Sequence, residues 1–251
     1  MGFYDLSKVE REKLFEKMRE EIRSDVKQGT KKKIHQYCGD EDTYIRKNAY
    51  LILGRAYRDE EGLQQKILTV LDRLIEEKEN ELLRQTAVYA LCEIGKHDAQ
   101  AILPRLESMI DDPHHKVRNA VVGGLKQMVN KNPEPSLAFT KKFLHHPDPR
   151  IRREIVHGIE LRGRTHPEDV LPLLAEVQDD QDIKVRKTLI HVLGQISYKK
   201  GCLEKVVKAL AMWKNQQIVE KAIDEILKVH EKYPFSEKTP EEAKDYIFKQ
   251  L

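Results

Sequence analysis

The stretch Asp148-Pro149-Arg150-Ile151-Arg152-Arg153-Glu154-Ile155 decides the fold, because its pattern recurs along the chain. The pattern is an aliphatic residue, an arginine, and a second apolar residue three positions after the arginine. Successive copies are 38, 34, 34 and 34 residues apart, with arginines at Arg46, Arg84, Arg118, Arg152 and Arg186. A fixed period of this length is the sequence signature of stacked helical repeats.

Each repeat is predicted to contain two helices, a helix A and then a helix B that opens just before the arginine. Polar links rich in Asp, Asn and Pro separate the helices, and these residues end one helix and cap the next. The predicted N-cap residues of helix B are Asp42, Asn80, His114, Asp148 and Asp182. The predicted pairs cover 30–38 with 43–57, 61–77 with 81–95, 98–110 with 115–130, 135–144 with 149–162, 167–178 with 183–198, and 202–213 with 216–232.

A single helix is predicted at each end of the array. Ser7 and Glu10 form a capping box at the start of the first, and Gly29 ends it. Thr239-Pro240-Glu241-Glu242 opens the last, whose apolar face would be Ala243, Tyr246, Ile247 and Leu251. We therefore predict an all-α, right-handed superhelical solenoid of about six helix pairs (30–232) between capping segments 1–29 and 233–251.

Composition fits this architecture and limits the function. Of the 251 residues, 35% are charged and 6% are aromatic, which suits helices with solvated outer faces. Net charge is +3, but residues 114–200 carry 16 Lys and Arg against 10 Asp and Glu, which favours a polyanionic partner. The scattered Cys38, Cys92 and Cys202 indicate buried free thiols and a cytoplasmic location. No run is apolar enough to cross a membrane, and no motif indicates a cofactor.

The repeat resembles the HEAT family and lacks the Trp-Leu-Gly-Tyr frame of tetratricopeptide repeats. HEAT repeats carry a proline in helix A, an aspartate in the turn and Val-Arg at the start of helix B. Two repeats match throughout, with Pro104, Asp112, Val117 and Arg118, and with Pro172, Asp180, Val185 and Arg186. The first repeat keeps Asp40 and Arg46. We expect the five repeat arginines and Asp40, Asp112 and Asp180 to form a structural ladder between layers.

Helix B lines the concave groove of a HEAT stack. Counting from the repeat arginine, positions −1, +3 and +7 are apolar, so positions +1, +5, +8 and +12 should face the groove. Gly54, Gly123 and Gly194 would let a partner approach the backbone. The predicted binding residues are Lys47, Arg58, Tyr89, Lys96, Lys126, Arg153, His157, Arg164, Lys187, His191 and Tyr198.

Basic side chains interleaved with aromatic ones suit a nucleic-acid backbone, and Glu160 is the only acid among the groove positions. A protein partner with an acidic segment requires the same lining. DNA or another polyanion and a protein-interaction scaffold both remain open at this point.

Residues 145–213 also resemble the AlkC/AlkD type of HEAT-like DNA glycosylases. The similar blocks are His146-Pro147-Asp148, Arg162-Gly163-Arg164, and Val185-Arg186-Lys187-Thr188-Leu189 with Leu193-Gly194-Gln195-Ile196-Ser197 and Trp213. The resemblance implies DNA binding and, in an active enzyme, a groove carboxylate at Glu160 or Glu154. That family has Asn-Asp where Gly194-Gln195 stand, so a non-catalytic relative is our first hypothesis and an active alkylpurine glycosylase an alternative.

Histidines occur in pairs at His114-His115 and His145-His146, but both pairs lie in predicted turns between helices and have no fixed carboxylate partner. We therefore predict no metal site.

Overall fold

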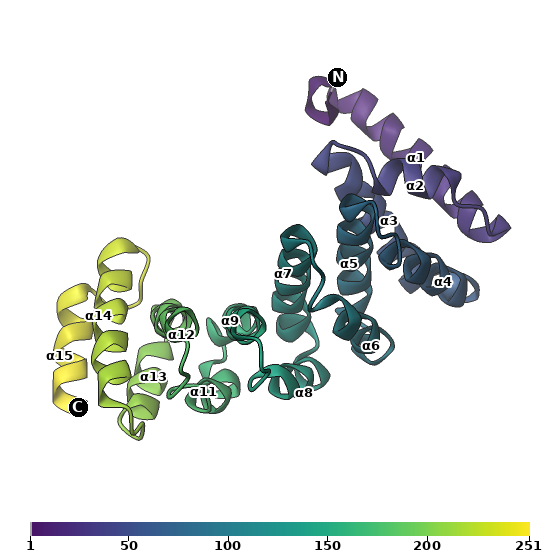
Figure 1. Cartoon of the computed structure of the whole chain (residues 1–251). Helices are drawn as coiled ribbons and strands as arrows, with labels where there is room; N and C mark the ends of the chain where they lie inside the picture. The colour runs from purple at the N-terminus through teal and green to yellow at the C-terminus, as the bar shows by residue number, and fades with distance from the viewer. Residues whose placement is uncertain (1) are drawn as a thin grey trace. The chain divides into compact units, whose positions relative to one another are not determined.

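The computed structural model describes residues 2–251, all of which lie in helices, turns or short connections, with no strand among them. The chain divides into two compact units, residues 1–124 and 125–251. The all-α prediction is confirmed, and helix pairs repeat along both units in the manner of an α-solenoid (Figure 1). The division into capping segments and a single array of six pairs stays a prediction, as does the handedness.

The helices of the first unit lie close to the predicted ranges. Their bounds are η1 Phe3–Asp5, α1 Lys8–Gln28, α2 Lys32–Cys38, α3 Thr43–Asp59, η2 Glu61–Leu63, α4 Gln64–Ile75, α5 Glu81–Gly95 and α6 Ala99–Met109, followed by α7 His115–Lys131, which continues into the second unit. Here α1 packs on α2 and α3, and α5 packs on α3, α4 and α6.

In the second unit, α9, α12 and α14 pack consecutively as B helices, and α11 packs on α13 among the A helices (Figure 1). Helix α15 packs on α13 and α14. The bounds are α8 Pro133–Phe143, α9 Pro149–Gly158, α10 Glu160–Gly163, α11 Pro167–Ala175, α12 Ile183–Gln195, α13 Cys202–Leu210, α14 Gln216–Lys232 and α15 Pro240–Gln250.

The predicted caps explain why the helices begin where they do. Asp42, Asn80, Asp148 and Asp182 each accept a backbone N–H from the first turn of their helix B. At the fifth site the Nδ1 atom of His114 accepts the N–H of Lys116, at 3.3 Å. Each cap satisfies an otherwise unpaired donor and contributes about 1 kcal/mol to helix stability.

The apolar positions of the repeat build the core. All residues at +3 and +7 are buried, from Ala49 and Leu53 in the first repeat to Leu189 and Leu193 in the fifth. The three cysteines are free and buried, as predicted. Among residues 2–251, no helix combines the length and the apolar character needed to cross a membrane.

Two local predictions are wrong. The helix predicted at 149–162 is interrupted at Ile159, so that Glu160 starts the short helix α10. The interruption follows Gly158, where an added Cβ would lie 2.9 Å from Leu125, and glycine is a common site of helix kinks. The predicted apolar face of the last helix is also too wide, because Leu251 is 49% exposed.

Candidate functional site

The repeat arginines form the same backbone contact in all five repeats. Each guanidinium donates to a carbonyl in the turn before its own helix B, with accepting residues Asp40, Lys78, Asp112, His146 and Asp180. This contact joins helix B to the end of its helix A.

Two of these arginines also reach the next repeat. Arg84 Nε donates to Asp112 at 2.8 Å, and Arg152 Nε donates to Asp180 at 2.6 Å. Both carboxylates receive a second N–H from the same guanidinium, a bidentate geometry that makes strong pairs. In the first repeat, the carbonyl of Asp40 accepts from Arg46, and its side chain accepts the backbone N–H of Asp42. The two pairs between repeats join an arginine to an aspartate 28 residues later, and no arginine stands 28 residues before Asp40.

In the second unit, position +5 brings side chains of neighbouring B helices together. Within the second unit, the rings of His157 and His191 are 6.3 Å apart, and His191 Nδ1 lies 3.6 Å from Glu225 of α14. Position +1 is exposed in the same helices, at Arg153 and Lys187. We call Lys126, Arg153, His157, Arg164, Lys187 and His191 the basic face of the second unit.

Position +8 is buried in four of the five repeats and half-buried at Lys126, so most of its groove assignments need correction. Gly54 is covered by the side chain of Glu93, and Gly194 by Glu225 and Val229, so neither glycine leaves its backbone open. Cys92 at position +8 and Tyr198 at position +12 are buried, with exposed fractions of 2% and 7%. Position +8 lies at the edge of the helix that the next helix B covers. Of the three glycines predicted to line the groove, Gly123 at position +5 is exposed.

Glu160 organises the centre of the basic face. Its side chain is 5% exposed, and Oε1 accepts a hydrogen bond from Arg164 Nη2 at 2.5 Å. Its Oε2 lies 3.3 Å from Lys126 Nζ and 3.0 Å from His157 Nε2. The sequence separates these partners by up to 38 residues, and the break at Ile159 places the carboxylate among them.

A second layer of contacts holds this cluster. Arg164 Nη2 also donates to the buried Gln195 at 2.9 Å, and the hydroxyl of Tyr233 donates to the same oxygen at 3.3 Å. Lys126 Nζ lies 2.8 Å from His157 Nε2. Nε2 therefore accepts from Lys126 when unprotonated and donates to Glu160 when protonated.

The electrostatics of the cluster keep Glu160 ionised. Burial by itself would raise the pKa of the carboxyl, but the hydrogen bond from His157 and the charges of Lys126 and Arg164 outweigh it and lower the pKa to about 2. A carboxylate with three cationic or donor partners is a weak base and a poor nucleophile.

Glu154, the other carboxylate candidate, is largely covered by neighbouring residues. It is 9% exposed, and its Oε1 lies 4.0 Å from Arg153 Nη2. Trp213 is buried after the end of α13, with an exposed fraction of 6%.

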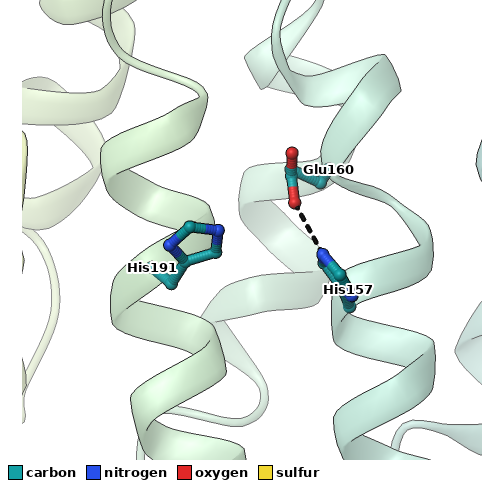
Figure 2. A group of neighbouring side chains, drawn as sticks. All are labelled: His157, Glu160 and His191. Carbon is teal, nitrogen blue, oxygen red and sulfur yellow. Dashed lines mark ion pairs between the residues drawn. The ribbon is translucent and has the colours of Figure 1, made fainter. Parts of the chain in front are cut away.

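Three side chains of the cluster could in principle hold a cation. Figure 2 shows His157 and Glu160 meeting His191 from the neighbouring helix, and their potential ligand atoms lie within 4.8 Å of one another. However, Lys126 Nζ already contacts His157 Nε2 and Glu160 Oε2, and its positive charge opposes a metal ion there. The expectation of no metal site stays a prediction.

The binding residues predicted in the first unit are only partly available. Arg58 pairs with Asp59 at 2.8 Å, and Lys96 pairs with Glu93. Lys47 is exposed and lines a cavity of about 700 Å³ between α3 and α5. In this cavity, the rings of Tyr50 and Tyr89 lie 5.3 Å apart, and burial raises the pKa of both phenols.

Sequence analysis missed the contribution of α14 to the basic face. One further step of 34 residues from Arg186 reaches Glu220, and the equivalent of +1 is then Lys221, with Glu225 at +5 and Lys228 at +8. Both lysines are exposed, and the contact between His191 and Glu225 aligns α14 with α12. The retained 34-residue step, despite the lost arginine, was the signal that could have revealed them.

Comparison with known proteins finds helical repeat proteins. A family model described as HEAT repeats matches residues 136–228, and no curated protein matches the chain. Among solved structures, the chain is similar to the Escherichia coli protein YibA, with 14% identity over 98% of this chain and 88% of that one and a TM-score of 0.45. It is also similar to a designed armadillo repeat protein in complex with a peptide, with 18% identity, coverage of 76% and 97%, and a TM-score of 0.35.

A third similarity is to the complex of CpcE and CpcF of phycocyanin lyase from Nostoc, with 19% identity, coverage of 86% and 92%, and a TM-score of 0.28. The family match covers three A helices and three B helices of the second unit, and the same aliphatic-arginine pattern opens the B helices of the first. Residues 136–228 of the second unit therefore match HEAT repeats, and the chain as a whole has the helical architecture of an α-solenoid.

Proposed function

We propose that the basic face of the second unit binds the phosphate backbone of a nucleic acid, without catalysing a reaction on it. The observation that carries this proposal is a row of exposed cations at one repeat position, Arg153 on α9, Lys187 on α12 and Lys221 on α14. Packed helices lie about 8–10 Å apart, so the row repeats a positive charge at that interval. A regular row of cations is suited to a polyanion whose charges also repeat.

The pairing of Glu160 supports binding over catalysis. Its charge is balanced inside the protein by Lys126 and Arg164, so the outer surface of the face stays positive. A glycosylase of the type discussed above would need a carboxylate directed at the sugar, whereas both oxygens of Glu160 are hydrogen-bonded within the cluster. Its side chain acts here as an organiser of cations.

The test is the salt dependence of nucleic-acid binding in two matched triple variants. One replaces Arg153, Lys187 and Lys221 by alanine, and the other replaces Lys208, Lys244 and Lys249, exposed lysines on α13 and α15. Affinities are measured by fluorescence anisotropy between 50 and 300 mM salt. We expect the first variant to bind more weakly, with the slope of log K against log salt reduced by about 2–3, and the second to resemble the wild type.

Four outcomes would overturn the proposal. Absence of binding at low salt would remove the nucleic-acid function, and equal losses in both variants would show that binding is not located on the basic face. Release of methylated purine by the wild-type protein, lost in Glu160→Gln, would establish glycosylase activity instead. Preferential binding of an acidic peptide would support the protein-interaction scaffold.

A further inference from the structure

An exposed aromatic ring lies beyond the C-terminal end of α14, in the segment before α15. Phe235 is 68% exposed and is stacked on Tyr233, with ring centroids 5.0 Å apart and an interplanar angle of 16°. The buried Tyr198 packs edge-on against both rings, at 5.2 and 5.7 Å. One face of Phe235 is therefore supported by a rigid aromatic pair, and the exposed surface lies on the rest of the ring.

Cationic side chains surround this ring. Phe235 lines a cavity of about 530 Å³ together with Arg164, Lys199, Lys200, Cys202 and Glu237. Lys199 and Lys200 are exposed, while the carboxylate of Glu237 accepts the N–H of Gly201 at 2.6 Å. Arg164 is paired with Glu160, which leaves the exposed Lys199 and Lys200 against Glu237, so the cavity favours an anionic ligand.

The ring is also fixed relative to the basic face. Tyr233, on which Phe235 stacks, donates to Gln195, and Gln195 accepts Arg164, which belongs to the basic face. The backbone N–H of Glu237 donates to the carbonyl of Tyr198 at 2.9 Å and holds the segment in place. A ring oriented in this way loses little conformational freedom when a ligand stacks on it.

The ligand chemistry that fits is a flat group that carries a negative charge. A nucleotide has both parts, since its base can stack on an aromatic ring and its phosphate can pair with lysine. A cavity of about 530 Å³ is also within the range of small-ligand sites. In a duplex the bases are paired and stacked on each other, so a base can reach Phe235 only from an unpaired strand.

We propose that the protein prefers single-stranded nucleic acid, with one base stacked on Phe235 and the adjacent phosphates held by Lys199 and Lys200. This inference rests on the proposed function, because it assumes that the basic face follows the same strand. It goes further by assigning the strand type and a base-stacking residue.

The experiment compares an oligonucleotide containing 2-aminopurine, single-stranded and in a duplex, with the variants Phe235→Ala, Phe235→Trp and Phe248→Ala. Phe248 of α15 is also 68% exposed and serves as the matched control. We expect the wild type to bind the single strand more tightly and to quench its fluorescence. Phe235→Ala should weaken single-strand binding by about 5- to 100-fold, with an unchanged salt slope, and Phe235→Trp should retain it.

The inference fails if the wild type binds duplex and single strand equally, or if Phe235→Ala behaves as Phe248→Ala does. In that case a salt slope that still depends on Arg153, Lys187 and Lys221 leaves the proposed function intact. If neither strand form binds at low salt, the inference and the proposed function fail together. Because Phe235 is exposed, its variants should fold, which the fluorescence of the buried Trp213 checks.

Discussion

Replacing Glu160 by glutamine tests whether the carboxylate organises the basic face. The substitution keeps the shape of the side chain and removes its charge, so it resembles the protonated acid. The pKa of Glu160 is lowered from 4.5 to about 2, because its hydrogen bond from His157 and the charges of Lys126 and Arg164 outweigh the effect of burial. A shift of this size corresponds to about 3 kcal/mol in favour of the folded state at neutral pH.

The sign of the effect sets its pH window. A carboxyl with a lowered pKa stabilises the fold fully above the unfolded value of 4.5, and the contribution is lost as the pH falls toward 2. We therefore expect Glu160→Gln to lower the free energy of unfolding by about 3 kcal/mol at pH 7 and by only about 1 kcal/mol at pH 3.

The assay is urea unfolding followed by the fluorescence of Trp213. This residue is the chain's single tryptophan and is buried in the second unit, so it reports the unit that contains Glu160. The control is Glu231→Gln, an exposed position on α14, which should change stability by less than about 0.5 kcal/mol. A loss below that value for Glu160→Gln at pH 7, or a loss equally large at pH 3, would refute the role assigned to the carboxylate.

Three further predictions concern the repeat framework. Arg84→Ala should destabilise the first unit by about 3 kcal/mol, because it leaves the buried Asp112 without its bidentate partner. Arg46→Ala removes only hydrogen bonds within its own repeat and should cost about 1 kcal/mol. Circular dichroism during urea unfolding compares the two variants, and equal losses would contradict the ladder between repeats. Gly124→Ala should cost at least about 2 kcal/mol, because its Cβ would lie 2.0 Å from Cys92 Sγ. Gly123→Ala, at the neighbouring exposed position, should instead stabilise α7 by up to about 1 kcal/mol. The same unfolding curves measure both, and a change of stability in the same direction for the two variants would contradict the packing. Burial raises the pKa of the Cys38 and Cys92 thiols to about 12, so a thiol reagent at pH 8 should label them only after unfolding; rapid labelling of the native protein would show that they are accessible.

The fold could be predicted from the sequence because each repeat contains the residues that begin its helix B and build its share of the core. Asp, Asn or His begins each helix B, and apolar residues at +3 and +7 face the core in every repeat. These signals are local, so the helices of a repeat can be predicted without knowing how the neighbouring repeats pack. The break at Ile159 was not predictable in this way, because it follows the close contact of Gly158 with Leu125, which belongs to the preceding helix B.

Which residues belong to the candidate site depends on how neighbouring repeats pack against one another. A helical projection places +1, +5, +8 and +12 on one side, and it correctly leaves Arg153 and Lys187 exposed. It cannot show that the next helix B covers Gly194 at +8, or that Tyr198 at +12 is buried against Tyr233 and Phe235. The stacked Phe235 lies after the last repeat, where the 34-residue pattern gives no position to project.

The same limit explains why Glu160 resembled a catalytic residue in the sequence. A single acid among many bases suggests a special chemical role when its partners are unknown. In the structure, Lys126 comes from the preceding repeat and Arg164 from the next turn, and both point at the carboxylate. Like charges so close together would repel one another, and a buried anion between them removes that cost. The carboxylate thus allows Lys126 and Arg164 to lie close together at the surface of the second unit.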